Sequence, residues 1–314
     1  MKTELVRLTF LTPVHFGGGR LSDSEYTCDA ATLFSALFIS ALPMQKAEEL
    51  LKAANTGEFA ISDAFPFIGD TYYLPKPASS ANTHTADIES GAAESTDSRA
   101  KKAFKKLKYL PVEKISSFMS GTLDPIPLVE GFRLGSSSAQ TKVNLQAVPE
   151  NDAMPYAVGG FTFAPDAGLY FVKKGSYPIE PLLEALSFSG LGGKRNVGYG
   201  RFAYEIVNAP AFMALLSSGG SGRTGRKMLL STATPAAQEW DEHILENAKY
   251  TIVRKGGFVQ SSSRSAATSK KRDMFLFRPG SLFARPFEGD IFDVNTSPGT
   301  HPVYRYARAL WAEV

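Results

Sequence analysis

The chain has 314 residues, of which 43% are apolar and 11% aromatic, enough to bury one large core or two smaller ones. Its single cysteine, Cys28, excludes an internal disulfide, and its four scattered histidines show no zinc-ligand spacing, so we expect no metal and no cofactor. It has no run of about 18 apolar residues, and its start alternates polar and apolar residues, unlike a signal peptide. We therefore expect a cytoplasmic protein that does not contact a membrane.

The net charge is only +3, but two segments are strongly basic. Residues 99–108 carry six cations and no acid, and residues 249–278 carry eight cations against the single acid Asp273. Clustered cations favour a polyanionic partner such as nucleic acid more than the total charge does. For residues 99–108, a solvated helix face and a phosphate contact both remain open.

The N-terminal third predicts a strand, a loop and a divided helix. Residues 2–11 alternate in the manner of a strand, and residues 13–20 form a glycine-rich loop. Residues 30–54 have leucines at helical spacing, and Pro43 should divide this helix because proline removes a hydrogen bond and clashes with the preceding turn. Asp29 is placed to cap it. A strand and a turn are predicted for residues 59–74.

The middle of the chain predicts an excursion and then a return to regular structure. Between residues 75 and 98 the composition collapses to Ser, Thr, Ala, Gly and acids, which predicts a mobile insertion. The elements expected beyond it are a helical pattern in the basic segment, irregular structure to 155, a strand at 161–172, a helix at 179–188 and a strand at 201–207.

This order resembles a βαββαβ ferredoxin-like unit interrupted by one insertion. A Gly/Ser-rich linker at 217–226 then leads to a second region. It should contain a strand at 227–231, a helix at 235–247, a strand at 250–255 and further short strands. We therefore predict an α+β fold of two ferredoxin-like (RRM-like) units, the second incomplete. The first spans residues 1–207, with a thumb-like insertion at about 76–155 and a glycine-rich loop at 190–200, and the second spans 208–314.

The most informative segment is the glycine-rich loop, which reads GLGGKRNVGYGRF over residues 190–202. Its five glycines let backbone N–H groups approach a ligand, and Lys194, Arg195 and Arg201 supply charge for phosphates. Tyr199 and Phe202 offer faces for base stacking. Alternatively, the loop is a tight helix-to-strand connection whose glycines relieve strain. Its spacing fits neither a Walker A loop nor a dinucleotide-binding fingerprint.

The loop at residues 13–20 is the second candidate site. His15, beside three glycines and Arg20, is suited to bind phosphate or to act as a general base in RNA cleavage. A cap for the helix that follows is an equally good interpretation of His15. The combination of cations, glycines and an aromatic residue recurs at Arg254-Lys255-Gly256-Gly257-Phe258, and Lys271 enters a predicted strand.

Several segments, in order along nearly the whole chain, resemble the RAMP superfamily of RNA-binding CRISPR subunits, and the closer match is to the Cas-five-type fourth subunits of type III-A Csm complexes. The segments that carry the resemblance are PVHFG at 13–17, TLFSAL at 32–37, YYLPKP at 72–77, KKLKYLP at 105–111, SGLGGKR at 189–195, RKGGF at 254–258, GSLF at 280–283 and HPVYRY at 301–306. Ala307 stands where a glycine is more usual.

The resemblance implies a non-catalytic subunit. Such a subunit grips the 5′ handle of the crRNA, caps that end of the complex, contacts the large Cas10-type subunit and the backbone subunits, and meets target RNA only indirectly. The insertion would correspond to a thumb-like β-hairpin that pushes between nucleotides at the first guide position. The expected RNA-binding residues are His15, Gly17, Gly18, Gly19, Arg20, Gly190, Gly192, Gly193, Lys194, Arg195, Asn196, Gly198, Gly200, Arg254, Lys255 and Lys271.

Two other functions compete with this one. The first is a crRNA-processing endoribonuclease of the same superfamily that uses His15. The second is a structural adaptor whose basic surfaces meet acidic partner proteins.

Overall fold

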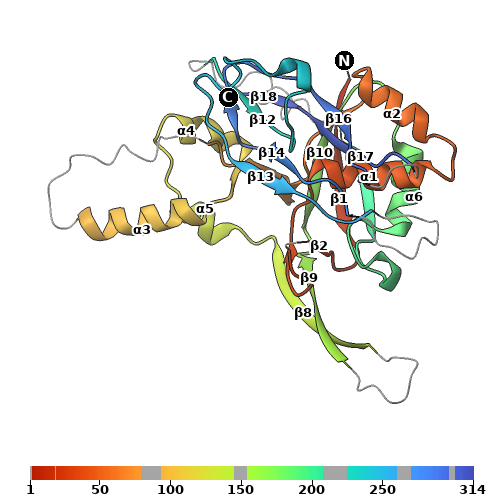
Figure 1. Ribbon diagram of the computed structural model, residues 1–314. Coiled ribbons are helices and arrows are strands. Elements are labelled where there is room, and N and C mark those ends of the chain that lie inside the picture. The colour runs from red at the N-terminus through yellow and green to blue at the C-terminus, as the bar shows by residue number, and fades with distance from the viewer. Residues whose placement is uncertain are drawn as a thin grey trace.

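The computed structural model describes residues 2–17, 19–78, 93–144, 154–207, 225–259, 270–296 and 301–314. Gly18, most of the low-complexity tract, nearly all of the predicted linker and residues 260–269 lie outside this part of the chain. The fold is a mixed α/β structure with antiparallel sheets (Figure 1). No helix within the described ranges has the length and apolar composition needed to cross a membrane.

A seven-stranded sheet forms the centre of the molecule, in the order β11-β1-β10-β5-β6-β7, with β4 also paired to β10. Its strands are β1 (Thr3–Phe10), β4 (Ala60–Ile61), β5 (Phe65–Ile68), β6 (Thr71–Pro75), β7 (Tyr109–Pro111), β10 (Ala167–Lys174) and β11 (Phe202–Val207). Every pairing within it is antiparallel, and Arg7 of β1 lies between Tyr170 of β10 and Glu205 of β11. The predicted first and last strands of the N-terminal unit are thus confirmed.

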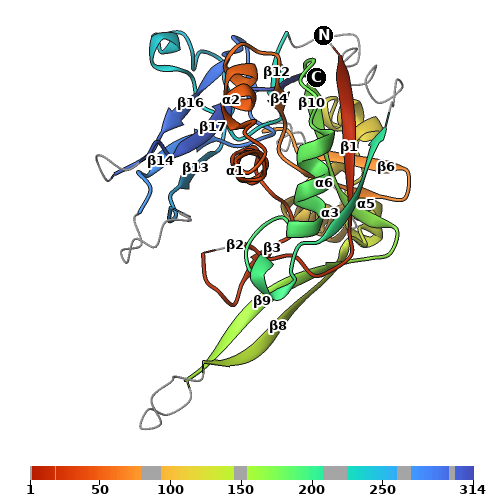
Figure 2. The same ribbon diagram turned by 90° about the vertical axis from the view of Figure 1, so that its right-hand side faces the viewer.

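Helices α1 (Ala30–Ala41), α2 (Ala47–Asn55) and α6 (Glu180–Ser189) belong to one side of the sheet (Figure 2). The core on this face includes Val6 and Leu8 of β1 with Leu37 of α1 and Leu183 of α6. Asp29 caps α1 by accepting the N–H of Thr32 at 2.7 Å. The predicted cap and the predicted break around Pro43 are both confirmed.

The opposite face of the sheet is covered by the C-terminal region. Strands β12 (Lys227–Leu229), β15 (Leu282–Phe283) and β18 (Trp311–Glu313) form a three-stranded sheet there. Leu5 and Tyr170 of the central sheet share a core with Met228 and Leu282 of this smaller sheet. The central sheet is therefore buried on both faces.

Two further C-terminal strand pairs reach around to the helical side. They are β13 (Ile252–Lys255) with β14 (Met274–Phe277), and β16 (Gly289–Asp293) with β17 (Tyr304–Arg308). Tyr306 of β17 is fully buried, stacks on Phe34 at 5.0 Å and accepts the N–H of Ile61 through its hydroxyl. The C-terminal region thus contributes to the core of the N-terminal region.

The described residues between β6 and β10 form more regular structure than the sequence suggested. It contains α3 (Ala93–Lys106), η2 (Val112–Lys114), α4 (Ile115–Met119), α5 (Ile126–Gly131) and the long hairpin β8 (Gly135–Asn144) with β9 (Met154–Phe163). Figure 1 shows this hairpin projecting away from the body. The strand character predicted for 161–172 is confirmed at 161–163 and 167–172, but the segment is not one strand, because Pro165 and Asp166 lie in a turn that separates β9 from β10.

The predicted helix at 235–247 was also wrong. The structure has only the short η4 (Ala237–Glu239) followed by turns. The Asp241 carboxylate accepts the N–H of His243, and Glu239 accepts N–H groups from Ala236 and, on another segment, Gly289. Such side-chain bonds to the backbone compete with helix formation.

Candidate nucleic-acid interface

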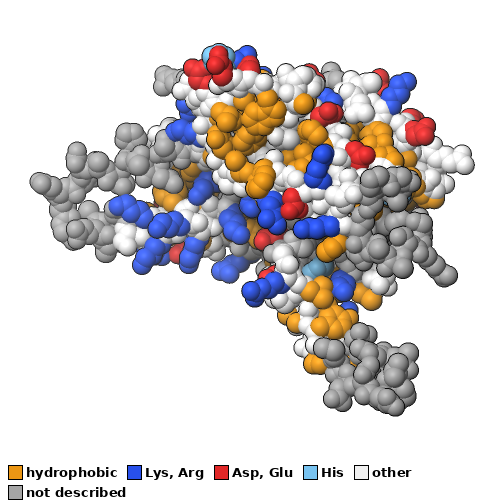
Figure 3. Space-filling view, in the orientation of Figure 1, with side chains coloured by type: hydrophobic (Ala, Val, Ile, Leu, Met, Phe, Trp, Pro, Cys, Tyr) orange, Lys and Arg blue, Asp and Glu red, His pale blue; other side chains and the backbone are white. Residues whose placement is uncertain are grey.

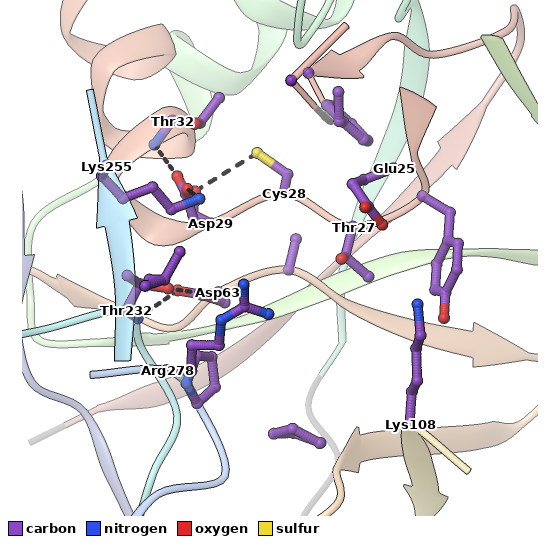
Figure 4. Close-up of a pocket in the computed structure, with 18 of the residues that line it drawn as sticks. Glu25, Thr27, Cys28, Asp29, Thr32, Asp63, Lys108, Thr232, Lys255 and Arg278 are labelled. Atoms are coloured by element: carbon purple, nitrogen blue, oxygen red, sulfur yellow. Dashed lines mark hydrogen bonds and ion pairs between the residues drawn. The ribbon is translucent and has the colours of Figure 1, made fainter. Parts of the chain in front are cut away.

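A groove of about 1170 Å³ lies where the N-terminal loops meet the basic segment and the β13–β14 hairpin. Its walls come from the His15 loop with its partner strands β2 (Phe16–Gly17) and β3 (Ser24–Glu25), the start of α1, the end of α3 and the 251–257 segment. Figure 4 shows Lys108 and Arg278 entering it from the side opposite Asp29 and Cys28. The groove therefore joins segments that are more than 200 residues apart.

The glycine-rich loop is packed tightly onto the His15 loop. Gly200 donates its N–H to the Pro13 carbonyl and Gly193 donates to the His15 carbonyl, both at 2.8 Å. A Cβ on Gly192 would lie 2.9 Å from the His15 carbonyl oxygen, so only glycine permits this approach. The N–H groups of Gly190 and Gly198 also donate to protein carbonyls. These four amides are used in hydrogen bonds within the fold.

The two aromatic residues of this loop do not present stacking faces. Tyr199 and Phe202 are 7% and 2% exposed, so the sequence-based expectation that bases stack on them was wrong. The alternating pattern of β11 points Phe202 inward, and Tyr199 packs against Gly160 of the β9 strand. Lys194, in a left-handed conformation with φ of 58°, instead extends its ammonium over the ring of Tyr156 at 5.6 Å.

His15 lines the groove but is only 7% exposed. Its Nδ1 lies 2.8 Å from the carbonyl oxygen of Gly159 on β9, and its ring lies against Gly193. The interpretation of His15 as a helix cap was wrong, because Asp29 occupies that position. The side chain ties the first loop to both the hairpin and the glycine-rich loop.

A buried acidic pair joins the two halves of the chain beside the groove. Asp63 accepts the N–H groups of Ala30 and Thr232 and the hydroxyl of Thr232, at 2.7 to 2.9 Å. Asp29 forms an ion pair with Lys255 at 2.5 Å. Figure 4 shows these contacts converging at the start of α1. The N-terminus of α1 is thereby tied through side chains to Thr232, which follows β12, and to Lys255 of β13.

The two carboxylates respond differently to the same burial. Burial, with the added charge of Asp29, raises the pKa of Asp63 to about 7. Burial would also raise the pKa of Asp29, but the Lys255 ammonium outweighs it and lowers that pKa. The same pair raises the pKa of Lys255 against the effect of burial. The positive charge of Lys255 is thus neutralised by Asp29 within the protein.

Five other cations of the groove are exposed. Lys105, Lys108, Lys270 and Arg278 line its wall with Arg254, whose side chain is 65% exposed. Figure 3 shows Lys and Arg side chains forming a band from the region of α3 across the centre of this face. Two basic segments that are remote in sequence therefore lie on the same face of the molecule.

Of the predicted site residues, the structure brings His15, Gly17, Gly19, Gly192, Gly193, Arg254 and Lys255 together at the groove wall. Arg20, Gly190, Lys194, Arg195, Asn196, Gly198, Gly200 and Lys271 lie outside the described lining. Lys271 is half-buried, and burial together with the Arg305 guanidinium lowers its pKa. Sequence reasoning left Lys105, Lys108 and Arg278 out of the site, although their basic runs were visible. Asp63 and Thr232 gave no signal, because their contact spans 169 residues.

Comparison with known proteins finds relatives that match almost the whole of this chain. The family model described as the CRISPR Csm4 C-terminal domain matches residues 223–314. The "CRISPR system Cms protein Csm4" of Mycobacterium tuberculosis strain CDC 1551 is 35% identical, over 99% of this chain and 97% of its own. The protein of the same name from Streptococcus thermophilus is 32% identical, over 99% of this chain and 98% of its own.

The fold is also similar to solved structures. A chain in the crystal structure of the Csm3–Csm4 subcomplex of the type III-A CRISPR-Cas interference complex gives a TM-score of 0.64, at 18% identity over 99% of both chains. A chain in the crystal structure of the Csm1–Csm4 cassette with pppApA gives 0.59, at 22% identity over 100% of this chain and 98% of that one.

Proposed function

The chain belongs to the Csm4 family, and we propose that it is the crRNA-binding subunit of a type III-A Csm interference complex in antiviral defence. In this role it grips the 5′ handle of the crRNA and caps that end of the complex. The groove lined by exposed cations is the observation that carries the RNA-binding part. Solved structures of relatives pair Csm4 with Csm3 and with Csm1, which supports the same neighbours here, a backbone subunit and the large Cas10-type subunit.

We further propose that residues 1–207 form a ferredoxin-like unit. The antiparallel order β11-β1-β10-β5, with α1 and α6 on one face, supports this assignment because it is the order of a βαββαβ unit. The β8–β9 hairpin is the counterpart of the expected thumb. Residues 208–314 are proposed as the second, incomplete unit.

The charge and exposure of the groove argue for a phosphate backbone as its ligand. Lys105, Lys108 and Arg278 are exposed, and all three line the groove. A single strand whose phosphates are neutralised by Z cations releases counterions, and its binding falls with salt with a slope of about −0.7Z. RNA held here should therefore show a steep salt dependence that depends on these side chains.

The test is a salt titration of binding between the full chain and single-stranded RNA that carries the repeat-derived handle. The triple variant Lys105→Ala, Lys108→Ala, Arg278→Ala should lower the magnitude of the slope by about 2, which is about 0.7 for each cation removed. The matched control replaces three exposed lysines away from the groove, Lys52, Lys114 and Lys174. An equal decrease of slope in both triple variants would show that charge in general, and not the groove, binds the RNA.

We propose a binding role for His15 rather than a catalytic one. Its hydrogen bond to Gly159 and its packing against Gly193 already account for its position. Incubation of the protein with full repeat RNA separates the two roles. RNA that stays intact supports binding alone, whereas cleavage that His15→Ala abolishes would establish the endoribonuclease.

A further inference from the structure

Two phenylalanines at the C-terminal side of the groove are exposed to solvent. Phe275 on β14 is 67% exposed, and Phe258 just after β13 is 65% exposed. Neighbouring rings in the same region, Phe277 and Phe283, are 4% and 0% exposed and pack in a core of their own. The two exposed rings therefore contribute little to the hydrophobic core.

The geometry of the β13–β14 pair directs one of these rings toward the groove cations. Phe275 lies directly opposite Arg254 in the antiparallel register, so both side chains project from the same face of the hairpin. Arg254 lines the groove. Phe258 follows Gly256 and Gly257, which also line it, and forms a β-bridge with Lys270. Each ring thus sits beside a cation at the edge of the same groove.

The surroundings of the rings are basic. Arg254, Lys270, Arg272 and Arg278 are exposed in these segments, against Asp273, which pairs with Arg254, and Asp293, which lies beside Arg272. Protein–protein interfaces are enriched in arginine and aromatic residues but depleted of lysine, whereas this surface continues into the groove lysines Lys105, Lys108 and Lys270. Single-stranded nucleic acid, in contrast, is held by aromatic faces for the bases and cations for the backbone. The chemistry of this edge favours unpaired RNA over a protein partner.

We propose that Phe275 and Phe258 are a base-stacking site for single-stranded RNA whose backbone lies along the groove cations. This inference rests on the proposed function and adds to it a contact with the bases. Stacking uses the face of a base, which every nucleotide has, so the site tolerates sequence. It also adds affinity that does not depend on salt, because no counterion is released when a ring meets a base.

The experiment combines ring variants with RNA in which one nucleotide at a time is abasic. Stacking on an aromatic side chain contributes about 1–3 kcal/mol per base, so Phe275→Leu should weaken handle binding about 5-fold or more. The salt slope should not change. One abasic position should weaken the wild type by a similar factor and have little effect on Phe275→Leu. Phe275→Tyr, which keeps a ring, should restore binding, and Phe258→Leu should reveal a second abasic position.

Phe188 provides a matched control. It is 68% exposed on α6, away from the described groove lining, so Phe188→Leu removes an equally exposed ring without changing the proposed site. Equal affinity of the wild type and Phe275→Leu for the handle, with the steep salt slope intact, would overturn the stacking site and leave the proposed function standing. Weaker capture of a partner subunit with unchanged RNA affinity would reassign the rings to protein docking. A wild type that binds no RNA would overturn both proposals.

Discussion

The glycine-rich loop at 190–200 and the β13–β14 hairpin have similar compositions but opposite environments. Both combine glycines, cations and aromatic residues. In the loop, glycine amides donate to protein carbonyls and Tyr199 is buried. In the hairpin region, Phe275 and Arg254 both face solvent. The segment with more glycines is thus the one with fewer groups left for a ligand.

This difference shows that a cluster of glycines indicates close approach of a backbone, and not necessarily a ligand site. Gly192 and Gly200 are required because another backbone approaches them closely, and that backbone belongs to the protein itself. Ligand chemistry depends instead on which side chains remain exposed along the groove. The loop shapes one wall of the groove, and the hairpin supplies functional groups to it.

The largest effect is expected from a comparison of two glycines in this loop, which tests whether the loop has a structural role. Gly200 has φ of +77°, and a Cβ there would overlap the Leu191 carbonyl oxygen, whereas Gly198 has φ of +89° with open space around it. Gly200→Ala should therefore lower the free energy of unfolding by about 3 kcal/mol, from the backbone strain together with the clash. Gly198→Ala should cost about 1 kcal/mol, from the left-handed conformation alone. Denaturant unfolding measures both, and equal decreases would show that the close approach of the Leu191 backbone to residue 200 does not require glycine.

Local patterns predicted the elements whose signals lie within a few residues. Three predictions were confirmed because alternation, proline and a capping side chain act locally. They are the strand at 2–11, the divided helix around Pro43 and the Asp29 cap. The strand predicted at 161–172 is divided in two, because the turn at Pro165 and Asp166 ends β9 and β10 begins only at Ala167. The helix at 235–247 failed because Glu239 bonds a segment about 50 residues away.

The site was predictable only in part, for the same reason. The sequence identified the His15 loop and the 254–257 segment, which both line the groove. It did not show that the end of α3 joins them, because that depends on how the chain returns after the insertion. It also placed stacking on Tyr199, since the composition of a loop does not tell which of its rings are buried.

The second prediction tests the link between the halves at Asp63. Asn can replace this carboxylate, because its amide oxygen accepts the two N–H groups and its NH₂ can donate to the Thr232 hydroxyl. With a folded-state pKa of about 7 against about 4 in the unfolded chain, the folded state binds more protons between these values. The contribution of the Asp63 carboxyl to the free energy of unfolding of the wild type therefore falls as pH rises from about 4 to 7.

Asp63→Asn lacks this titration, so the variant should gain stability relative to wild type by about 2.6 kcal/mol between pH 5 and pH 8. The difference should flatten above pH 7. Unfolding free energies of both proteins across this range give the measurement. A difference that does not depend on pH would mean that Asp63 is ionised in the folded protein at pH 5, as the hydrogen bonds to its carboxylate favour.

The smallest expected effect separates two adjacent cations of the hairpin. Lys255 is compensated by Asp29, whereas Arg254 is only loosely paired with Asp273 at 3.5 Å and is exposed. Removing the whole buried pair, with Lys255→Met and Asp29→Asn together, should leave the salt slope of RNA binding unchanged, because the net charge stays the same. Arg254→Met should reduce the slope by about 0.7, which is about a threefold change in relative affinity over a fourfold range of salt. The same titration of handle RNA measures both variants. A reduced slope in the pair variant would mean that Lys255 leaves Asp29 to contact a phosphate when RNA binds, and the groove would then gain a cation only in the bound state.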